Sequence, residues 1–492
     1  MAVNIIRKNI FFQPDTKRII ARFFYISDER SIKIIKRVLS LSEERQAMLL
    51  GQVLRGYSKR HRSIIAIFEK HFDRLKDCFL LLDIEPSSLS TVQKLLIGSY
   101  FTMEYSIEAA AFFNPSVVED IDQTQLDDGE KRIILSFRAT GEGHVSSIVF
   151  RSAIIDEHHN IRMEHVGNML DKPAQIKNHR YHKKSFLKKL KEMHCLYGNV
   201  YDIIADKLTD TFTYEELKRY VEETKAEIIL NQEGQVFLKE IMWLASSHYE
   251  MAFSLDTSIS ERVIFPIADT EKRGIEDARF VKFTGDDGEV VYYATYTAYD
   301  GVTILPKLLS TRDFYHFKVL PFHGEIAQNK GIALFPRKIN GKYAMLCRID
   351  GENNYIAFSD TINVWREPAK LIQTPEHSWE FVQLGNCGSP IETSEGWLVI
   401  THGVGPMREY VLGASLFDLN EPDKEIGRLT LPLLSPDEKE REGYVPNVVY
   451  SCGALIHNKH LILPYAMSDH ASTYATIEME RLLDELKESK RS

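Results

Sequence analysis

The 492-residue chain has few cysteines and no long apolar run. Its five cysteines are Cys78, Cys195, Cys347, Cys387 and Cys452. They are odd in number, scattered and without CxxC spacing, which indicates a reducing compartment and no zinc site. No segment approaches the roughly 20 apolar residues that a membrane-spanning helix needs. We therefore expect a cytoplasmic protein with no metal centre and no membrane partner.

An excess of positive charge is also missing. The formal net charge is −9. A nucleic-acid binder neutralises phosphates with a basic surface, so this balance weighs against a nucleic-acid partner. The segment 141–143 has the letters GEG but does not extend to GxGxxG, so it is no dinucleotide fingerprint. We expect no organic cofactor.

Helical and β-rich segments alternate along the chain. Apolar residues recur at helical spacing between about residues 28 and 112, for example at Ile32 and Ile35. Short apolar runs separated by turns follow from Asn114 onward, and a helical stretch rich in lysine and glutamate interrupts them. The expected organisation is a helical extension at 1–112, a β-domain at 113–476 with a helical insert at about 172–245, and a C-terminal helix at 477–492.

One apolar strand pattern occurs five times in the β-rich part. The copies are 133–138, 291–296, 343–348, 397–402 and 461–466. The last four follow one another at intervals of roughly 50–65 residues, which is typical of propeller blades. The predicted fold class is therefore mainly β, a five-bladed β-propeller with a helical extension and a helical insert. A β-sandwich with a similar number of strands is the alternative.

The ends of these repeats indicate where a site would lie. The innermost strand of each propeller blade lines the central channel, and side chains near its end share one axial pocket. Polar or aromatic residues end or follow four of the five copies, and Asp469 follows the fifth. The four are Arg138, Tyr296, Arg348 and His402. We expect these side chains to converge.

The densest group of charged residues precedes the second repeat. Glu276 and Asp277 are adjacent, and Arg279 follows two positions later. Neighbouring residues of an extended segment point to opposite sides, so both carboxylates can face one pocket only if the chain is kinked. One of them would then face a substrate while the other holds the loop. Arg279 could pair with Asp277 or bind sugar hydroxyls, and a surface turn with a salt bridge is the alternative.

Several segments of the β-rich part carry a family resemblance. They are 274–279, 292–301, 333–336, 396–404, 445–450 and 451–454. In order and spacing they resemble glycoside hydrolase family 130, which contains β-mannoside phosphorylases and some β-1,2-mannosidases. The resemblance covers about 114–165 and 250–475 and implies a five-bladed propeller. It implies nothing about the helical extension or the helical insert.

The resemblance implies an inverting reaction on β-1,2- or β-1,4-linked manno-oligosaccharides. Asp277 matches the general acid, whose proton reaches the glycosidic oxygen through a hydroxyl of the mannosyl unit. Inorganic phosphate is the co-substrate and nucleophile, and the products are α-mannose 1-phosphate and a shorter sugar. Lys330, Arg348 and His402 match phosphate-binding positions, where positive charge neutralises the incoming anion.

The resemblance also places other residues near the sugar or the phosphate. Those we expect to bind substrate are Asn114, Arg138, Arg279, Tyr299, Asp300 and Asp469. Tyr299 supplies a ring that could stack on a sugar face. For each residue taken alone, a turn or an inter-blade hydrogen bond is the alternative.

Three positions bear on the choice between phosphate and water. The hydrolases of the family use glutamates to activate water. Glu352 matches one of these, whereas Asn386 stands at the position of the second. Gln383 stands where many phosphorylases have lysine. An inverting β-1,2-mannosidase with Glu352 as its base is therefore the first alternative, and a non-catalytic carbohydrate-binding propeller is the second. The linkage, the acceptor sugar and the oligomeric state stay open, with a homo-oligomer as one option.

Overall fold

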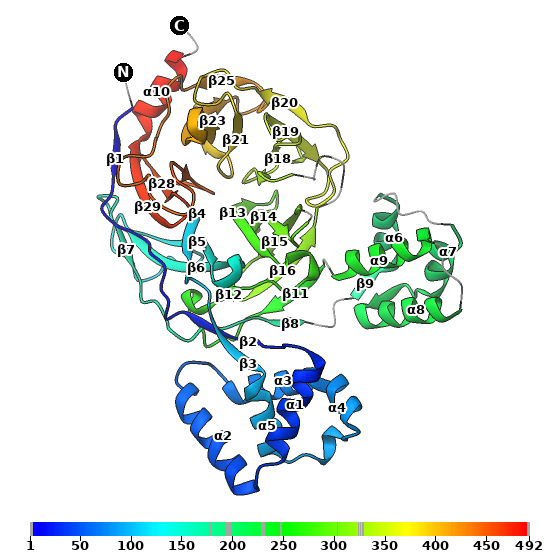
Figure 1. Ribbon diagram of the computed structural model, residues 1–492. Coiled ribbons are helices and arrows are strands. Elements are labelled where there is room, and N and C mark those ends of the chain that lie inside the picture. The colour runs from blue at the N-terminus through cyan, green and yellow to red at the C-terminus, as the bar shows by residue number, and fades with distance from the viewer. Residues whose placement is uncertain are drawn as a thin grey trace.

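The computed structural model describes residues 3–489 except 177–179, 193–197, 228–231, 247, 303, 323, 325 and 327–328. Most of its strands form five antiparallel groups around a common centre, and two helical segments lie outside them (Figure 1). The molecule is mainly β, as predicted.

The first two groups are joined at one point. The first contains β4 (Ala111–Glu119), β5 (Lys131–Thr140), β6 (Ser146–Ile155) and β7 (Ile161–Met163). The second contains β13 (Gly274–Thr284), β14 (Val290–Tyr299), β15 (Ile304–Thr311), β16 (His316–Pro321), β11 (Tyr249–Ala252) and β8 (Ala174–Ile176). A single parallel pair, Gly274 with Ser146, connects β13 to β6. The short β12 (Val263–Ile264) adds to β6.

The other three groups are separate sheets. The third contains β17 (Ala333–Leu334), β18 (Tyr343–Cys347), β19 (Asn354–Ser359) and β20 (Lys370–Gln373). The fourth contains β21 (Gln383–Asn386), β23 (Gly396–Val404), β24 (Tyr410–Phe417) and β25 (Glu425–Arg428), with β22 (Ile391–Thr393) on β23. The fifth contains β26 (Val449–Tyr450), β28 (His460–Met467), β29 (Ala471–Glu478) and β1 (Ile5–Arg7), with β27 (Leu455–His457) on β28. Because β1 pairs with β29, the start of the chain completes the last group.

The five sequence repeats lie in β5, β14, β18, β23 and β28, the second strand of each group. The expectation that they are the innermost strands is wrong, because each has hydrogen-bonded neighbours on both sides. The end strands beside them are β4, β13, β17, β21 and β26, which we call the first strands of the groups. A strand with neighbours on both sides and both faces covered carries a near-continuous apolar run, as β23 does with every residue buried. The first strands carry a weaker apolar pattern, and two of them have only two residues.

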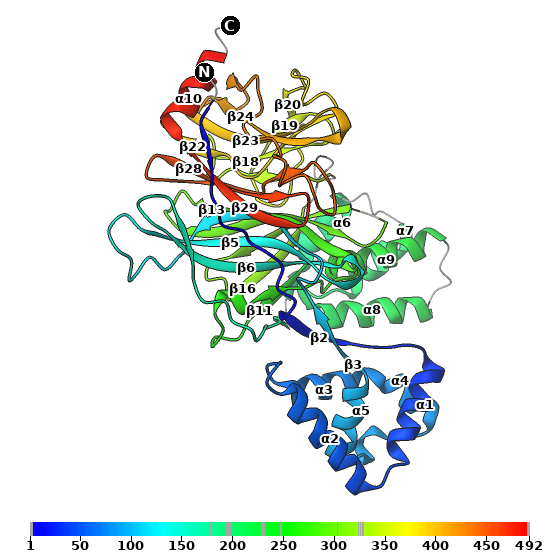
Figure 2. The same ribbon diagram turned by 60° about the vertical axis from the view of Figure 1, so that its left-hand side comes forward.

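The N-terminal helices form a separate body with its own core. They are α1 (Asp28–Leu39), α2 (Glu43–Tyr57), α3 (Ile64–Phe72), α4 (Lys76–Leu82) and α5 (Thr91–Tyr100). Serine side chains cap the N-termini of α1, α2 and α5. A two-stranded arm of β2 (Ile19–Phe23) and β3 (Thr102–Ser106) joins this body to the β-rich part (Figure 2). The expected boundary at residue 112 falls inside β4, because the apolar pattern continues from α5 through β3 into β4.

The insert and the last helix complete the fold. The insert contains a hairpin of β9 (Arg180–His182) and β10 (Thr211–Thr213) and four helices beside the second group (Figure 1). These are α6 (Lys183–Glu192), α7 (Gly198–Lys207), α8 (Tyr214–Glu227) and α9 (Gln232–Ser246). The last helix, α10 (Met479–Ser489), buries Leu482 and Leu486 in the core of the fourth and fifth groups. Within the described ranges, no helix is long and apolar enough to cross a membrane.

Candidate active site

Two β-bulges lie in the neighbouring first strands β4 and β13. One interrupts β4 at Asn114, and the other interrupts β13 at Asp277. Both residues have left-handed backbone, with φ of 50° and 53°, which is costly for residues other than glycine. Asn114 Nδ2 donates a hydrogen bond of 2.7 Å to Asp277 Oδ1. Bulges and strained backbone of this kind concentrate at functional sites.

The bulge in β13 is the kink that two adjacent carboxylates require. Arg138 donates from Nη2 to Glu276 Oε1 at 2.7 Å and from Nη1 to Asp277 Oδ1 at 3.3 Å. Lys330 Nζ donates to Glu276 Oε2 at 2.7 Å. Glu276 therefore spans two cations, and Asp277 is held by one cation and one amide. We call Asn114, Arg138, Glu276, Asp277 and Lys330, joined by these contacts, the carboxylate network.

Asp469 lies beside the carboxylate network, also with left-handed backbone. Burial and the charge of Asp277 raise the pKa of Asp469 to about 6. Asp277 behaves in the opposite way. Burial favours its neutral form, but Arg138, Arg279 and Lys330 outweigh burial and hold the pKa of Asp277 below its ordinary value. With these neighbours Asp277 is a carboxylate, and Asp469 is the acid that keeps its proton to a higher pH.

A second set of side chains is built on cations. Arg279 Nη2 donates to the hydroxyl of Tyr450 at 2.7 Å. Arg348 Nη1 lies 3.4 Å from His402 Nε2, and Gln383 Nε2 lies 3.2 Å from the same ring nitrogen. The rings of His402 and Tyr450 meet edge to face, with centroids 5.0 Å apart. We call these five residues the cation network.

His402 is neutral in this arrangement. The Arg348 guanidinium can only donate, so His402 Nε2 accepts. Burial, together with Arg348 and Arg279, holds the pKa of His402 well below its ordinary value. The positive charge of the cation network therefore comes from its two arginines.

No carboxylate of the described chain forms an ion pair with Arg279 or Arg348, whereas Arg138 and Lys330 both have one. Arg279 is only 3% exposed. The Nε atoms of Arg279 and Arg348 are buried without a hydrogen-bond partner. Asp277 acts electrostatically on Arg279 but is not within ion-pair distance, so the positive charge of the two arginines is only partly balanced, which is costly inside a protein. The cation network is thus suited to an anionic ligand.

The other residues expected to bind substrate or water lie in turns. Tyr299 donates its hydroxyl to Gly301 O at 3.0 Å, and Asp300 Oδ1 accepts from Val302 N at 2.8 Å in the turn after β14. Glu352 lies in the turn between β18 and β19 with an exposed side chain. Its backbone carbonyl accepts from Leu384 N in β21, next to Gln383 of the cation network.

Tyr296 does not reach the site, and its expected convergence with the other repeat ends is wrong. Its ring is 3% exposed, and its hydroxyl donates to Glu271 Oε1 at 2.8 Å. Glu271 also pairs with Lys307 at 2.7 Å, with both side chains fully buried. This buried carboxylate draws the tyrosine away from the centre and fixes the segment that leads into β13.

Sequence reasoning gave no role to two members of the cation network, Tyr450 and Gln383. Tyr450 ends the segment 445–450, which carried part of the family resemblance, so its position was a usable signal. Gln383 was noted only as a departure from lysine. Cys387 also touches the site, with Sγ 3.6 Å from His402 Nδ1.

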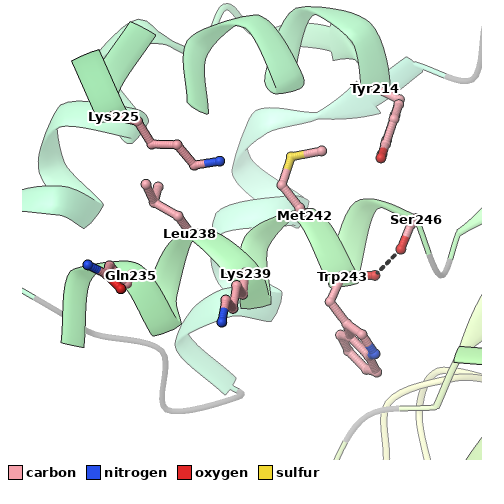
Figure 3. Close-up of a pocket in the computed structure, with 8 residues that line it drawn as sticks. All are labelled: Tyr214, Lys225, Gln235, Leu238, Lys239, Met242, Trp243 and Ser246. Carbon is pink, nitrogen blue, oxygen red and sulfur yellow. Dashed lines mark hydrogen bonds between the residues drawn. The ribbon is translucent and has the colours of Figure 1, made fainter. Parts of the chain in front are cut away.

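A separate cavity of about 590 Å³ lies in the insert (Figure 3). It is lined by residues of α8 and α9, among them Leu238, Met242 and two lysines, Lys225 and Lys239. Ser246 donates to the backbone carbonyl of Trp243 at 3.0 Å at one end of it. It includes no member of either network.

Comparison with known proteins places the site in a family. Residues 251–488 match a sequence model described as β-1,4-mannooligosaccharide phosphorylase of glycoside hydrolase family 130. A 1,2-β-oligomannan phosphorylase of Thermoanaerobacter sp. (strain X514) is 36% identical over 218 residues, which is 43% of this chain and 70% of the relative. The chain belongs to glycoside hydrolase family 130.

Two further proteins are similar to this family 130 member. A β-1,2-mannobiose phosphorylase of Listeria innocua serovar 6a is 30% identical over 264 residues, covering 52% of this chain and 71% of the relative. A solved structure of a β-1,2-mannobiose phosphorylase from Listeria innocua with β-1,2-mannobiose is 21% identical, with a TM-score of 0.45, and covers 77% of this chain and 92% of that one. The family match includes Asp277, Lys330, Arg348, His402 and Asp469, whereas Asn114 and Arg138 precede it.

Proposed function

We propose that the protein cleaves β-mannosides by inverting phosphorolysis, giving α-mannose 1-phosphate and a shorter sugar. The observation that carries the proposal is the cation network beside the carboxylate network around Asp277. Its buried Arg279 and half-buried Arg348 have no carboxylate within ion-pair distance in the described chain. Relatives named as 1,2-β-oligomannan and β-1,2-mannobiose phosphorylases support it. The substrates would be a manno-oligosaccharide and inorganic phosphate, with no cofactor.

The proposal includes a five-bladed β-propeller. Each antiparallel group would be one blade, with β4, β13, β17, β21 and β26 lining the axis. The arrangement of the groups around one centre and the pairing of β1 with β29 support this assignment (Figure 1). The helical extension, the insert and the C-terminal helix would be additions to it. A cytoplasmic location stays a prediction from the cysteine pattern.

Phosphate would bind to the cation network. Arg348 would donate to its oxygens, with His402 beside it and Lys330 approaching from the carboxylate network. Charge-assisted hydrogen bonds of this kind are worth roughly 1.5–3 kcal/mol each. Held there, a phosphate oxygen attacks C1 of the mannosyl unit as the bond from C1 to the glycosidic oxygen breaks. The nucleophile already carries its charge, so the protein supplies position and neutralisation.

Asp277 would be the general acid, and it needs a proton that the ligand-free site does not favour. The charges that lower the pKa of Asp277 include Arg279 and Lys330. A bound phosphate would offset these cations, so the pKa of Asp277 would rise as the site fills. Its proton then passes through a mannosyl hydroxyl to the glycosidic oxygen. Asn114, Arg138 and Asp469 would hold sugar hydroxyls around it.

The product decides between phosphorolysis and hydrolysis. The purified protein is incubated with β-1,2-mannobiose or β-1,4-mannobiose, with and without inorganic phosphate, and mannose and mannose 1-phosphate are quantified. Phosphorolysis predicts α-mannose 1-phosphate only when phosphate is present. Mannose released at the same rate without phosphate would support the hydrolase that uses Glu352. Binding without turnover would support a carbohydrate-binding protein.

A further inference from the structure

An exposed pair of neighbouring aromatic rings lies outside both networks. The rings of Tyr444 and His144 have centroids 5.3 Å apart and planes inclined by 30°. Tyr444 is 68% exposed, and His144 is exposed and has left-handed backbone with φ of 58°. The two residues are far apart in the sequence. His144 lies in the loop after β5, and Tyr444 lies in the loop before β26.

Both loops adjoin segments that carry residues of the candidate site. His144 follows Arg138 by six positions, at the end of β5 where Arg138 lies. The loop of Tyr444 packs on the segment that carries Asp469. Val445 N donates to Ser468 O at 3.1 Å, and the backbone of Gly443 lies so close to Ser468 that no Cβ fits there. The two rings therefore lie on loops that adjoin the chain segments of Arg138 and Asp469.

The helical extension fixes one of these loops. Tyr105, in β3 of the arm, donates its hydroxyl to Glu142 O at 3.0 Å and to Val145 O at 3.2 Å, on both sides of His144. Tyr105 is 2% exposed. At the start of the same loop, Gly141 packs against the backbone of Ser106 with no room for a Cβ. The arm thus fixes the backbone on both sides of His144, and with it the position of the His144 ring.

We infer that the Tyr444–His144 pair is a platform on which a sugar unit of the mannoside stacks, and that Tyr105 is a positioning residue for it. A large ring exposed to water gains most from an apolar partner of matching flat shape, and the C–H face of a pyranose is one. Held by Tyr105, the platform is rigid before substrate arrives, which reduces the entropy lost on binding. The extension would then contribute to substrate selection without touching the scissile bond. The identity of the sugar rests on the proposed function.

Steady-state kinetics on β-1,2-mannotriose test the platform. Tyr444→Ala should raise the KM for mannotriose about tenfold, which corresponds to one stacking contact. The KM for phosphate should stay within about twofold. Tyr105→Phe should raise the KM for mannotriose about threefold with kcat unchanged. The matched control is Tyr181→Phe in the insert, a buried tyrosine whose hydroxyl also donates to two carbonyl oxygens, Ala245 O at 2.8 Å and His248 O at 3.1 Å. It should change neither constant.

A KM for mannotriose that stays within twofold in Tyr444→Ala, or a KM for phosphate that rises in parallel, would overturn the platform. Failure of the proposed function looks different, because the wild type would then release mannose without needing phosphate, and the KM for mannotriose would still test the platform. If mannotriose is not turned over at all, calorimetric titration of mannotriose into the wild type and Tyr444→Ala replaces the kinetics. Equal affinities, or no binding by the wild type, would also overturn the inference.

Discussion

The two networks of the candidate site differ in how their charges are balanced. In the carboxylate network, Arg138 and Lys330 each pair with Glu276, and Arg138 also reaches Asp277. In the cation network, Arg279 donates to the phenol of Tyr450, and Arg348 donates to the neutral imidazole of His402. The cations of the carboxylate network are paired with carboxylates of the protein, whereas buried Arg279 and half-buried Arg348 have none within ion-pair distance in the described chain.

This difference assigns the two networks different partners. A set of cations paired with carboxylates can bind neutral hydroxyl groups by exchanging hydrogen bonds, without a net change of charge. A set with buried positive charge gains most from an anion. The carboxylate network therefore suits the sugar and the proton transfer, and the cation network suits the phosphate. Substitutions of Asp277 and Arg348 should therefore change different kinetic constants.

The largest effect is expected from Asp277→Asn. An amide cannot donate the proton that the leaving sugar needs, so turnover of unactivated mannosides should fall about 10²–10⁴-fold. The initial rate on mannobiose measures this, and a melting curve shows that the fold is intact. Asp286→Asn, at the exposed far end of the same β13–β14 hairpin, is the matched control. Near wild-type turnover in Asp277→Asn would remove this residue from the mechanism.

Arg348→Ala should act on phosphate more than on the sugar. Loss of one or two charge-assisted hydrogen bonds should raise the KM for phosphate about 10- to 100-fold, while the KM for the mannoside changes less than about threefold. Lys330→Ala should have a smaller effect on phosphate, because its Nζ is already held by Glu276 and its side chain is 38% exposed.

Arg337→Ala is the control for Arg348→Ala, since that arginine is paired with Glu392 at the surface. A small loss of activity in Arg348→Ala together with a large loss in Glu352→Gln would contradict the comparison of the two networks. That pattern would indicate that Glu352 activates water.

The repeats and the segment 274–279 were enough to predict a mainly β fold, and the resemblance carried by that segment makes Asp277 the expected general acid. They also predicted that a kink would be needed to bring Glu276 and Asp277 to one side, and the bulge in β13 supplies it. Apolar periodicity could not tell which strand of each group is innermost, because the strongest apolar pattern belongs to the second strand. It could also not anticipate Glu271, whose burial with Lys307 takes Tyr296 out of the site.

Long-range contacts explain what else the sequence could not predict. Asn114 and Asp277 are 163 positions apart, and Arg279 and Tyr450 are 171 apart, yet each pair is hydrogen-bonded. Contacts between strands far apart in the chain bring such residues together, and no local sequence pattern predicts them. The family resemblance pointed to most of these positions but not to the pairings between them.

The smallest effect concerns the pH dependence of stability. The pKa of Asp469 is raised to about 6 from an ordinary value of 3.8. The folded state thus binds more protons than the unfolded state between these values, and the stability contributed by Asp469 falls as pH rises through about 6. Asp469→Asn removes the charge. The free energy of unfolding of the variant, relative to the wild type, should therefore be larger at pH 7.5 than at pH 4, by about 2 kcal/mol at most. Urea unfolding of both proteins at the two pH values measures this, and an equal difference at both would contradict it.

The most direct test of the account is whether the cation network binds phosphate in the absence of sugar. Calorimetric titration of inorganic phosphate into the wild type, Arg348→Ala and Asp277→Asn compares the two networks at equilibrium. We expect the wild type to bind phosphate, Arg348→Ala to bind it at least about tenfold more weakly, and Asp277→Asn to bind it no more weakly than the wild type, because a nearby negative charge is gone. No phosphate binding by the wild type, or equal affinities in the wild type and Arg348→Ala, would contradict the account.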